Sequence, residues 1–149
     1  AVGPSDLTGS PATLITRHSL RESKAGTVLL IDANRDHAMA AALTLKKVGY
    51  RISTADSATV AFIELEQDKY DVIIIDPSTA GFADMGIESI PDALRAKLPT
   101  NSPEVPILLA LAEDMSSVEY GYSGTVVKPY DKEELVAQVA RRVPQKVVA

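Results

Sequence analysis

The sequence contains no cysteine and no tryptophan, and only 5% of its 149 residues are aromatic. The absence of cysteine excludes a disulfide scaffold, a thiolate zinc site and a cysteine nucleophile. Because aromatic side chains are scarce, the hydrophobic core has to consist mainly of valine, isoleucine, leucine and alanine. A chain of this length buries enough surface to fold without disulfides or a structural metal.

Positive charge is also scarce, since 15 lysine and arginine residues face 20 aspartate and glutamate residues, which leaves a formal net charge of −5. A general nucleic-acid-binding protein needs a basic face, so this balance argues against that class. No apolar stretch approaches the roughly 18 residues that a membrane-spanning helix needs. Residues 1–10 lack the charged start and apolar run of a secretory signal, so we expect a cytoplasmic location.

The composition changes at about residue 25. Residues 1–24 are rich in glycine, proline, serine and threonine without a sustained hydrophobic period, which is typical of a flexible interdomain linker or tail. In residues 25–149, apolar runs alternate with amphipathic segments, which predicts one domain. Because the sequence starts at Ala1 rather than at a methionine, we expect it to be a fragment of a longer protein.

Five short segments have the composition of strands. Four are continuous apolar runs, the pattern of strands buried on both faces of a parallel sheet, and the fifth is weaker and predicted to lie near an edge. The apolar strands are predicted at 28–31, 72–75, 105–111 and 125–127, and the edge strand at 51–54.

Helical patterns lie between and after these strands. Ser57 and Asp131 are candidate N-caps, Gly49 is a candidate C-cap, and Pro91 is expected to interrupt the third helix. The four helices are predicted at 36–48, 57–67, 86–98 and 131–143.

The apolar spacing within the helices predicts which side chains share a face. In the first helix, Met39, Ala42 and Leu43 are expected on one side, and in the second, Val60, Phe62 and Ile63 are expected to point inward. The last helix has an apolar stripe made of Leu135, Val136, Val139, Ala140 and Val143.

Alternating strands and helices predict an α/β fold, with a parallel sheet covered by helices on both faces. Right-handed crossovers restrict the topology to a doubly wound sheet, in which ligands bind beyond the carboxyl ends of the strands. Asp32, Asp76 and Lys128 each follow a predicted strand directly, so all three are expected at this end of the sheet.

Two strands that end in aspartate, followed by one that ends in Lys128-Pro129, resemble the receiver domain of two-component signalling over about residues 26–143. The resemblance implies a flavodoxin-like five-stranded sheet of order 2-1-3-4-5 and a cis Lys128–Pro129 bond. It implies that Asp76 accepts a phosphoryl group from a histidine and that Lys128 contacts the phosphoryl oxygens. An acidic pair beginning at Asp32 would hold Mg²⁺, since phosphoryl transfer needs positioning and charge neutralisation.

The sequence departs from the receiver pattern at this metal site. Ala33 takes the place of the acid that touches the metal directly, so Asp32, Asp76 and the backbone carbonyl of Ser78 are left as a weakened Mg²⁺ site. The loss of one carboxylate can weaken metal binding about tenfold. Asn34 offers a neutral oxygen ligand that partly compensates.

Two more departures affect the switch that responds to phosphorylation. Leu111 stands where the family has a serine or threonine that hydrogen-bonds the phosphoryl group, and Thr125 stands where an aromatic side chain is common. The segment from Leu111 to Lys128 is several residues shorter than usual, which predicts a shortened or missing fourth helix. The combination is that of a degenerate receiver, or pseudo-receiver, whose usual switch is uncoupled.

Residues 14–22 are similar to the segment that joins the ATP-binding domain of hybrid sensor histidine kinases to their receiver. This similarity implies that the parent protein is a histidine kinase and that this domain, not itself expected to be an enzyme, is a regulatory and protein-interaction module in the phosphorelay. The implied partner is the kinase core or a second receiver domain in the same protein. Contacts with nucleic acid or membrane are not expected.

Two other functions stay open. A working phosphoacceptor would use Asp76, assisted by Asp32, Lys128 and Mg²⁺, whereas a small-ligand sensor would bind a molecule such as a nucleotide second messenger near the altered fourth helix. No glycine-rich phosphate loop supports the sensor. The aspartates could also be polar strand ends, with Lys128 a salt-bridge partner that remains from a former active site.

Other polar and aromatic residues have ordinary interpretations. His18 and His37 are expected to be exposed. Tyr120, Tyr122 and Tyr130 cluster around the shortened segment, where they either replace packing or form a partner surface.

Overall fold

The computed structural model describes residues 26–99, 104–112 and 119–143. The predicted linker at 1–24, including His18, therefore lies outside the described residues.

Five parallel strands form one sheet, in the order β3-β2-β4-β5-β6. Numbered along the described chain this is 2-1-3-4-5, so the predicted doubly wound α/β class and sheet order are confirmed. β3 lies at one edge, as predicted, but β6 occupies the other edge and is only partly buried. The strands are β2 (Thr27–Ile31), β3 (Arg51–Ala55), β4 (Val72–Ile75), β5 (Ile107–Leu111) and β6 (Gly124–Val127).

Four α-helices are found in the described part of the chain. Ser57 and Asp131 cap two of them, since their side chains accept hydrogen bonds from Val60 N and Glu134 N. The third predicted helix is divided into the 3₁₀ turn η1 and a short helix with Pro91 in its first turn. The elements are α3 (Arg35–Lys47), α4 (Ala58–Gln67), η1 (Ile87–Ser89), α5 (Ile90–Arg95) and α6 (Lys132–Arg142).

The connection between β5 and β6 carries the shortening that the sequence predicts. Residues 113–118 of this connection are not among those described, and the described remainder holds one helical piece, the 3₁₀ turn η2 (Glu119–Gly121). The chain thus has a helix after each of β2, β3, β4 and β6, with a 3₁₀ turn in the described part of the β5–β6 connection.

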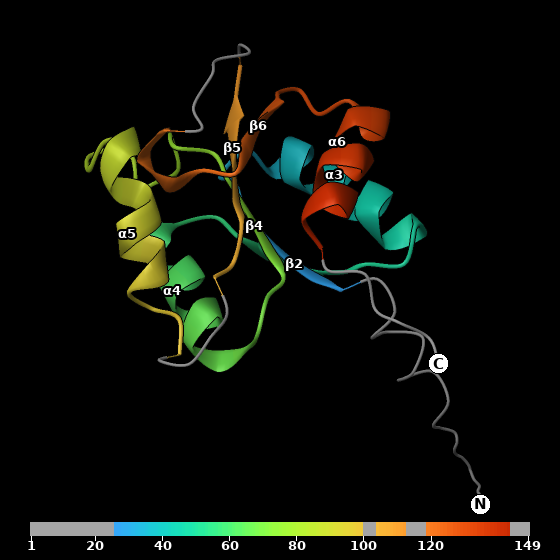
Figure 1. The fold of residues 1–149 in the computed structure, drawn as a ribbon. Coiled ribbons are helices and arrows are strands. Elements are labelled where there is room, and N and C mark those ends of the chain that lie inside the picture. Colours follow the sequence, from blue (N-terminus) through green and yellow to red (C-terminus); the bar gives the residue numbers. More distant parts are fainter. Residues whose placement is uncertain (1–25, 100–103, 113–118, 144–149) are drawn as a thin grey trace, which may run out of the picture.

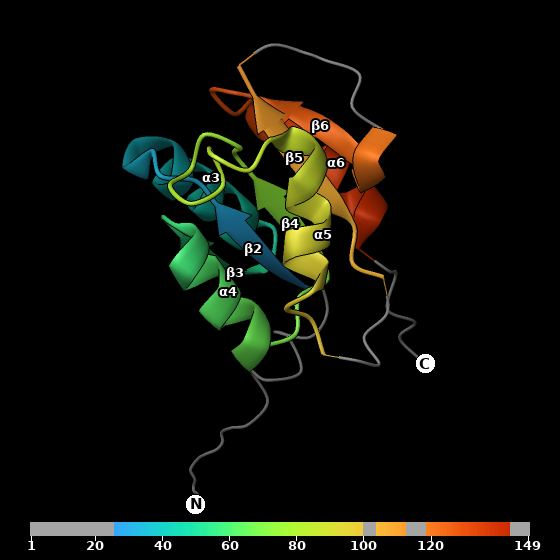
Figure 2. The ribbon, with the colours of Figure 1, turned by 90° about the vertical axis from the view of Figure 1, so that its left-hand side faces the viewer.

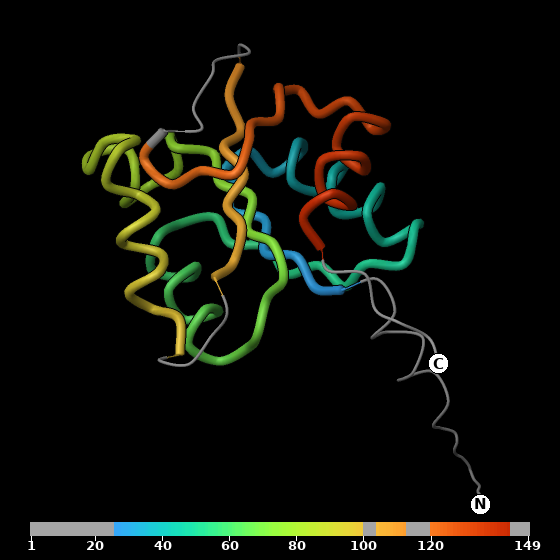
Figure 3. The backbone as a smooth tube through the Cα atoms, viewed as in Figure 1, coloured from blue at the N-terminus to red at the C-terminus, as the bar shows by residue number. Residues whose placement is uncertain are grey.

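The helices cover the sheet in two layers. α4 and α5 lie on one face and α3 and α6 on the other (Figure 1), and Figure 2 looks onto the side of α4 and α5. Successive side chains of a strand point to opposite faces. Accordingly, Leu29 and Ile31 belong to the core cluster beneath α4 and α5, while Val28 and Leu30 belong to the cluster beneath α3 and α6. The tube in Figure 3 shows that α3 and α6, distant in sequence, run side by side.

Some helix faces differ from those predicted. Ile63 is exposed rather than inward, while Val60 and Phe62 are partly buried, because α4 packs through Ala58, Ala61 and Leu65. Ala140 of the predicted stripe in α6 is likewise exposed. Small side chains allow a helix to approach the sheet closely, so the larger residues beside them remain outside.

α3 shows the same preference for alanine at its inner face. It buries Ala38, Ala41, Ala42 and Leu45, whereas Met39 and Leu43 are 62% and 57% exposed. The side that was expected to hold Met39, Ala42 and Leu43 is therefore divided between core and surface. None of the helices in the described ranges combines the length and apolar character needed to cross a membrane.

Candidate functional site

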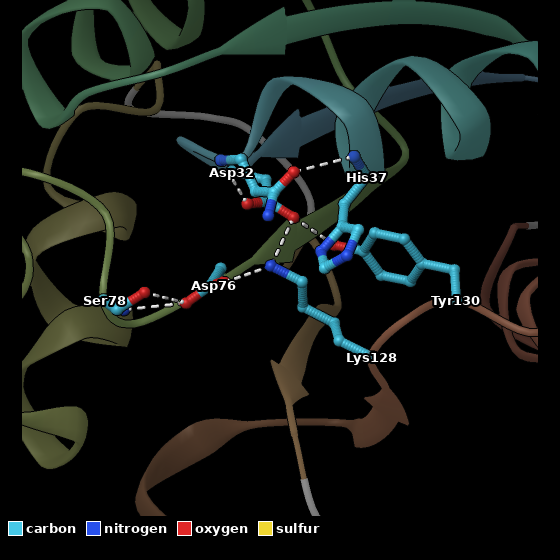
Figure 4. A network of polar contacts seen from close by, with 7 residues as sticks. Asp32, His37, Asp76, Ser78, Lys128 and Tyr130 are labelled. Carbon is cyan, nitrogen blue, oxygen red and sulfur yellow. Dashed lines mark hydrogen bonds and ion pairs between the residues drawn. The ribbon is translucent and has the colours of Figure 1, made fainter.

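The sheet brings Asp32, Asp76 and Lys128 together beyond the carboxyl ends of β2, β4 and β6. Ile31 is the register partner of Ile75, so the residues that follow these two strands lie next to each other. The backbone N–H of Asp76 donates to Ile31 O at 2.9 Å, and that of Lys128 donates to Leu111 O at 2.7 Å. These bonds extend the sheet by one residue and fix where the side chains of Asp76 and Lys128 begin. Figure 4 shows the resulting cluster.

Lys128 places its ammonium group between the two carboxylates. Its Nζ lies 2.8 Å from Asp32 Oδ2 and also donates a hydrogen bond to Asp76 Oδ2. The side chain of Lys128 is 9% exposed and that of Asp32 is 1% exposed, so solvent screens this arrangement little. One cation is therefore shared by two acids that the chain places more than 40 positions apart. The bond from Lys128 to Pro129 is cis, as the resemblance implied.

Asp76 has hydrogen-bond donors on both of its oxygens. Its Oδ1 accepts from the Ser78 backbone N–H at 2.8 Å and from the Ser78 hydroxyl at 2.7 Å, while Oδ2 accepts from Lys128. Burial alone would raise the pKa of Asp76, but the hydrogen bonds from Lys128 and Ser78 outweigh it and hold the pKa below its ordinary value. Asp76 is consequently an anion at neutral pH.

The same balance operates at Lys128. Burial alone would lower its pKa, and the hydrogen bonds to Asp32 and Asp76 reverse this effect and raise the pKa above its ordinary value. The ammonium therefore stays charged at neutral pH. Figure 4 shows Lys128 between the two aspartates, with Ser78 on the far side of Asp76.

Asp32 is a buried carboxylate whose oxygens are already used. Its Oδ1 accepts from Asn34 N at 2.9 Å, and its Oδ2 accepts from the Tyr130 hydroxyl at 2.9 Å as well as from Lys128. Burial, followed by the charge of Asp32, raises the pKa of Tyr130, which keeps its phenol protonated as a donor. Tyr130 is thus part of the cluster, although its place in the sequence indicates only packing or partner binding.

The remaining tyrosines and His37 have different surroundings. Tyr122 is a core residue whose hydroxyl donates to Ile87 O at 2.7 Å, whereas Tyr120 is exposed. His37 is half-buried rather than exposed, because its ring packs edge-on against Tyr130 with centroids 6.3 Å apart. The three tyrosines therefore do not form one cluster: one fills the core, one faces solvent and one enters the polar site.

The residues next to Asp32 do not supply the missing metal ligand. Ala33 has no oxygen in its side chain, and the Asn34 side-chain oxygen accepts a 3.0 Å hydrogen bond from His37 N as the N-cap of α3. The expectation that Asn34 compensates for Ala33 as a ligand finds no support in this arrangement. The amide oxygen caps a helix instead.

A Mg²⁺ ion does not fit the cluster as it is arranged. Mg²⁺ requires a near-octahedral set of oxygen ligands at short distance. Across the described ranges, no group of three or more histidine, aspartate or glutamate side chains could hold a metal ion. The oxygens of Asp32 accept two hydrogen bonds and form an ion pair with Lys128, whose ammonium lies between the two acids that would be ligands.

Comparisons with known proteins agree with the fold. The family described as "Response regulator receiver domain" matches residues 28–140. The C4-dicarboxylate transport transcriptional regulatory protein DctD of Rhizobium meliloti (strain 1021) is 30% identical in an alignment of 129 residues that covers 83% of this chain and 26% of that protein. The chain therefore spans about a quarter of the length of this curated relative.

Solved structures show the same fold. A putative response regulator from Chloroflexus aurantiacus J-10-fl has a TM-score of 0.66 at 24% identity, covering 79% of this chain and 97% of its own. The receiver domain of the sensor histidine kinase PA1611 from Pseudomonas aeruginosa PAO1, solved with a magnesium ion in its active site cleft, has a TM-score of 0.65 at 22% identity with the same coverage. At these identities the likeness shows the fold alone.

Proposed function

Because the chain belongs to the response regulator receiver domain family of two-component signalling, we propose that it is a degenerate receiver. In this role it acts as a regulatory and protein-interaction module of a hybrid sensor histidine kinase. The observation that carries the proposal is the position of Lys128, whose ammonium lies between Asp32 and Asp76 while Ala33 leaves out the second acid. Because the second acid is missing, the cluster offers a metal ion one carboxylate fewer than a working phosphoryl-transfer site of this family would.

The end of β5 supports the same proposal. Leu111 is half-buried, packs against the core beneath α4 and α5, and accepts the Lys128 backbone N–H through its carbonyl. Its side chain has no hydrogen-bond donor. A phosphoryl group on Asp76 would consequently find no hydroxyl at this position. The hydrogen bond that couples phosphorylation to a movement of β5 could then not form.

The surface of α3 suggests where a protein partner binds. The exposed Met39 and Leu43 line a groove of about 920 Å³ that also reaches Asp32 and Ala33. Exposed apolar groups gathered beside a groove often mark protein interaction sites. We assign this groove to the kinase core or to a second receiver domain of the same protein. The similarity of residues 14–22 to a hybrid-kinase linker supports such a parent.

A second candidate function is that of a working phosphoacceptor. The observation that favours it is the retained pair of Asp76 and Lys128, since a receiver that accepts a phosphoryl group needs both an ionised carboxylate and a nearby ammonium. In that case Asp76 takes the phosphoryl group from a kinase histidine, with Asp32, Lys128 and Mg²⁺ assisting.

Beryllofluoride, a phosphoryl mimic, separates the two functions when added with Mg²⁺ to the 149-residue chain. A degenerate receiver is expected to show an unchanged amide NMR spectrum at Asp76, Ser78 and Lys128. Asp76→Asn, which cannot take up the mimic, is the matched control. Shifts at these amides in the native chain that vanish in the control would overturn the degenerate assignment and support the phosphoacceptor.

A further inference from the structure

The hydroxyl of Tyr130 reaches an acid that lies 98 positions earlier in the chain, donating to Asp32 Oδ2 at 2.9 Å. We propose that Tyr130 closes the acidic cluster against divalent cations, by holding Asp32 in a hydrogen-bonded arrangement in which Lys128 is the resident cation. This role of Tyr130 rests on the proposed function as a degenerate receiver. The Tyr130 hydroxyl is then a second cause of metal exclusion, beside the replacement of the family's second acid by Ala33.

Tyr130 hinders metal binding first because, together with Lys128, it saturates one oxygen of Asp32. Oδ2 accepts from both of them, and Oδ1 accepts from Asn34 N, so a metal ion has to displace existing donors before it can bind. The Tyr130 hydroxyl would then be left in a buried site without its partner. An unpaired buried donor costs free energy, so the phenol opposes metal entry even where an additional acid favours it.

The second reason is that the ring of Tyr130 is held in place from several sides. It packs against the core beneath α3 and α6, and His37 meets it edge-on at an interplanar angle of 77°. The Nζ of Lys128 lies 5.8 Å from the ring centroid. In Figure 4 the rings of His37 and Tyr130 lie together on one side of Lys128, with Asp76 and Ser78 on the other. The hydroxyl is therefore positioned toward Asp32 before any ligand arrives.

Restoring the missing acid separates the two causes of exclusion. Ala33→Asp supplies the carboxylate, and Tyr130→Phe removes the hydroxyl while keeping the ring that packs on His37. If the missing acid at position 33 were the whole cause of metal exclusion, Ala33→Asp would bind Mg²⁺ as tightly as the double variant Ala33→Asp/Tyr130→Phe. If Tyr130 also closes the site, the double variant gains affinity beyond that of Ala33→Asp.

The experiment is a MgCl₂ titration of the 149-residue chain, followed by NMR at the amides of residues 32, 33 and 76. The native chain is expected to show no saturable shift. Ala33→Asp is expected to bind weakly, and Ala33→Asp/Tyr130→Phe about tenfold more tightly, which corresponds to about 1.4 kcal/mol. The matched control is Ala33→Asp/Tyr120→Phe, which removes the hydroxyl of an exposed tyrosine and should leave the affinity of Ala33→Asp unchanged.

Equal affinities of Ala33→Asp and Ala33→Asp/Tyr130→Phe would overturn the role of Tyr130 and leave the degenerate assignment intact. Saturable Mg²⁺ binding by the native chain would instead contradict metal exclusion as a whole. The single variant Tyr130→Phe provides a second measurement, in which Mn²⁺ should broaden the Asp32 and Asp76 amides more than in the native chain. Equal broadening in the two proteins argues against the proposal even if the double variant does not fold.

Discussion

The loss of Lys128 should disturb the polar cluster strongly. Its ammonium is nearly enclosed and pairs with both Asp32 and Asp76, whose remaining donors are backbone N–H groups and the hydroxyls of Ser78 and Tyr130. Without it, two carboxylates would face each other in a region that solvent screens poorly. Removing one partner of such a buried ion pair leaves uncompensated charge.

Lys128→Met is therefore expected to lower the free energy of unfolding by about 3 kcal/mol, the lower end of the range for a broken buried pair. Methionine keeps much of the aliphatic stem and removes the charge. Urea denaturation measures the difference, with Lys132→Met, at an exposed lysine in the first turn of α6, as the matched control. The control should change stability by less than about 0.5 kcal/mol. Similar effects of the two substitutions would contradict a structural role for the ion pair.

The ionised pair also predicts how stability varies with pH. The pKa of Asp76 is lower in the folded chain, so its stabilisation is complete above its unfolded pKa, about 4, and is lost as the pH falls through the folded pKa. The pKa of Lys128 is raised, so its stabilisation is complete below its unfolded value, about 10.4, and is lost above the raised pKa. Both contributions are present together between these limits.

We expect the difference in unfolding free energy between the native chain and Asp76→Asn to be constant from about pH 5 to about pH 9 and to shrink below about pH 4. Denaturant titrations at a series of pH values test this window. Asp84→Asn, at an exposed aspartate in the loop after β4, is the control and should give no such loss. A difference that grows toward acid pH would reverse the sign argued for Asp76.

At the scale of elements, α6 fixes the segment that carries Lys128 and Tyr130. The helix begins at Lys132, and the Asp131 side chain accepts from Glu134 N at 2.9 Å as its N-cap. The cap thus follows Tyr130 directly. Asp131→Ala is expected to reduce stability by about 1 kcal/mol, which thermal or urea unfolding can measure. The exposed neighbour Glu133→Ala is the control, and an equal loss in both would show that capping is not the cause.

The sequence predicts elements well because their signals are local. The run at 72–75 coincides with β4, and the N-caps Ser57 and Asp131 were identified from residues adjacent to their helices. Which side chains face inward is less local, since it depends on what the helix packs against. Ile63 and Ala140 were assigned to the core from spacing alone, and both are exposed.

In the site, too, local signals predict some features and miss others. Strand-end positions were enough to bring Asp32, Asp76 and Lys128 to one end of the sheet, because parallel strands align their carboxyl ends. The Tyr130–Asp32 bond joins residues 98 positions apart, and no local pattern reports it. The available signal was proximity, since Tyr130 lies two residues beyond Lys128. Asn34 was considered only as a ligand, and its hydrogen bond from His37 N shows that it caps α3.

At the scale of the whole molecule, the question is whether an event at Asp76 can reach the far edge of the sheet. β5 and β6 pair from Leu108–Gly124 to Leu111–Val127, so the last residue of β5 connects the cluster to the edge strand. Leu111 accepts a backbone hydrogen bond from Lys128, but its side chain belongs to the core. Backbone hydrogen bonds therefore connect the site to β5 and β6. The side chain at the end of β5, however, offers no polar contact to a group on Asp76.

We predict that a hydroxyl at position 111 restores the coupling between Asp76 and β6. In Ala33→Asp/Tyr130→Phe, beryllofluoride with Mg²⁺ should shift the NMR signals of Asp32, Asp76 and Lys128 only. Adding Leu111→Thr supplies a hydroxyl at the end of β5, and the shifts should then extend along β6 to Gly124 and Thr125. Asp76→Asn in the triple variant is the control that removes every shift. Because the added hydroxyl is the direct side-chain contact between the phosphoryl mimic and β5, shifts that already reach Gly124 without Leu111→Thr would show that the native sheet transmits the signal by another route.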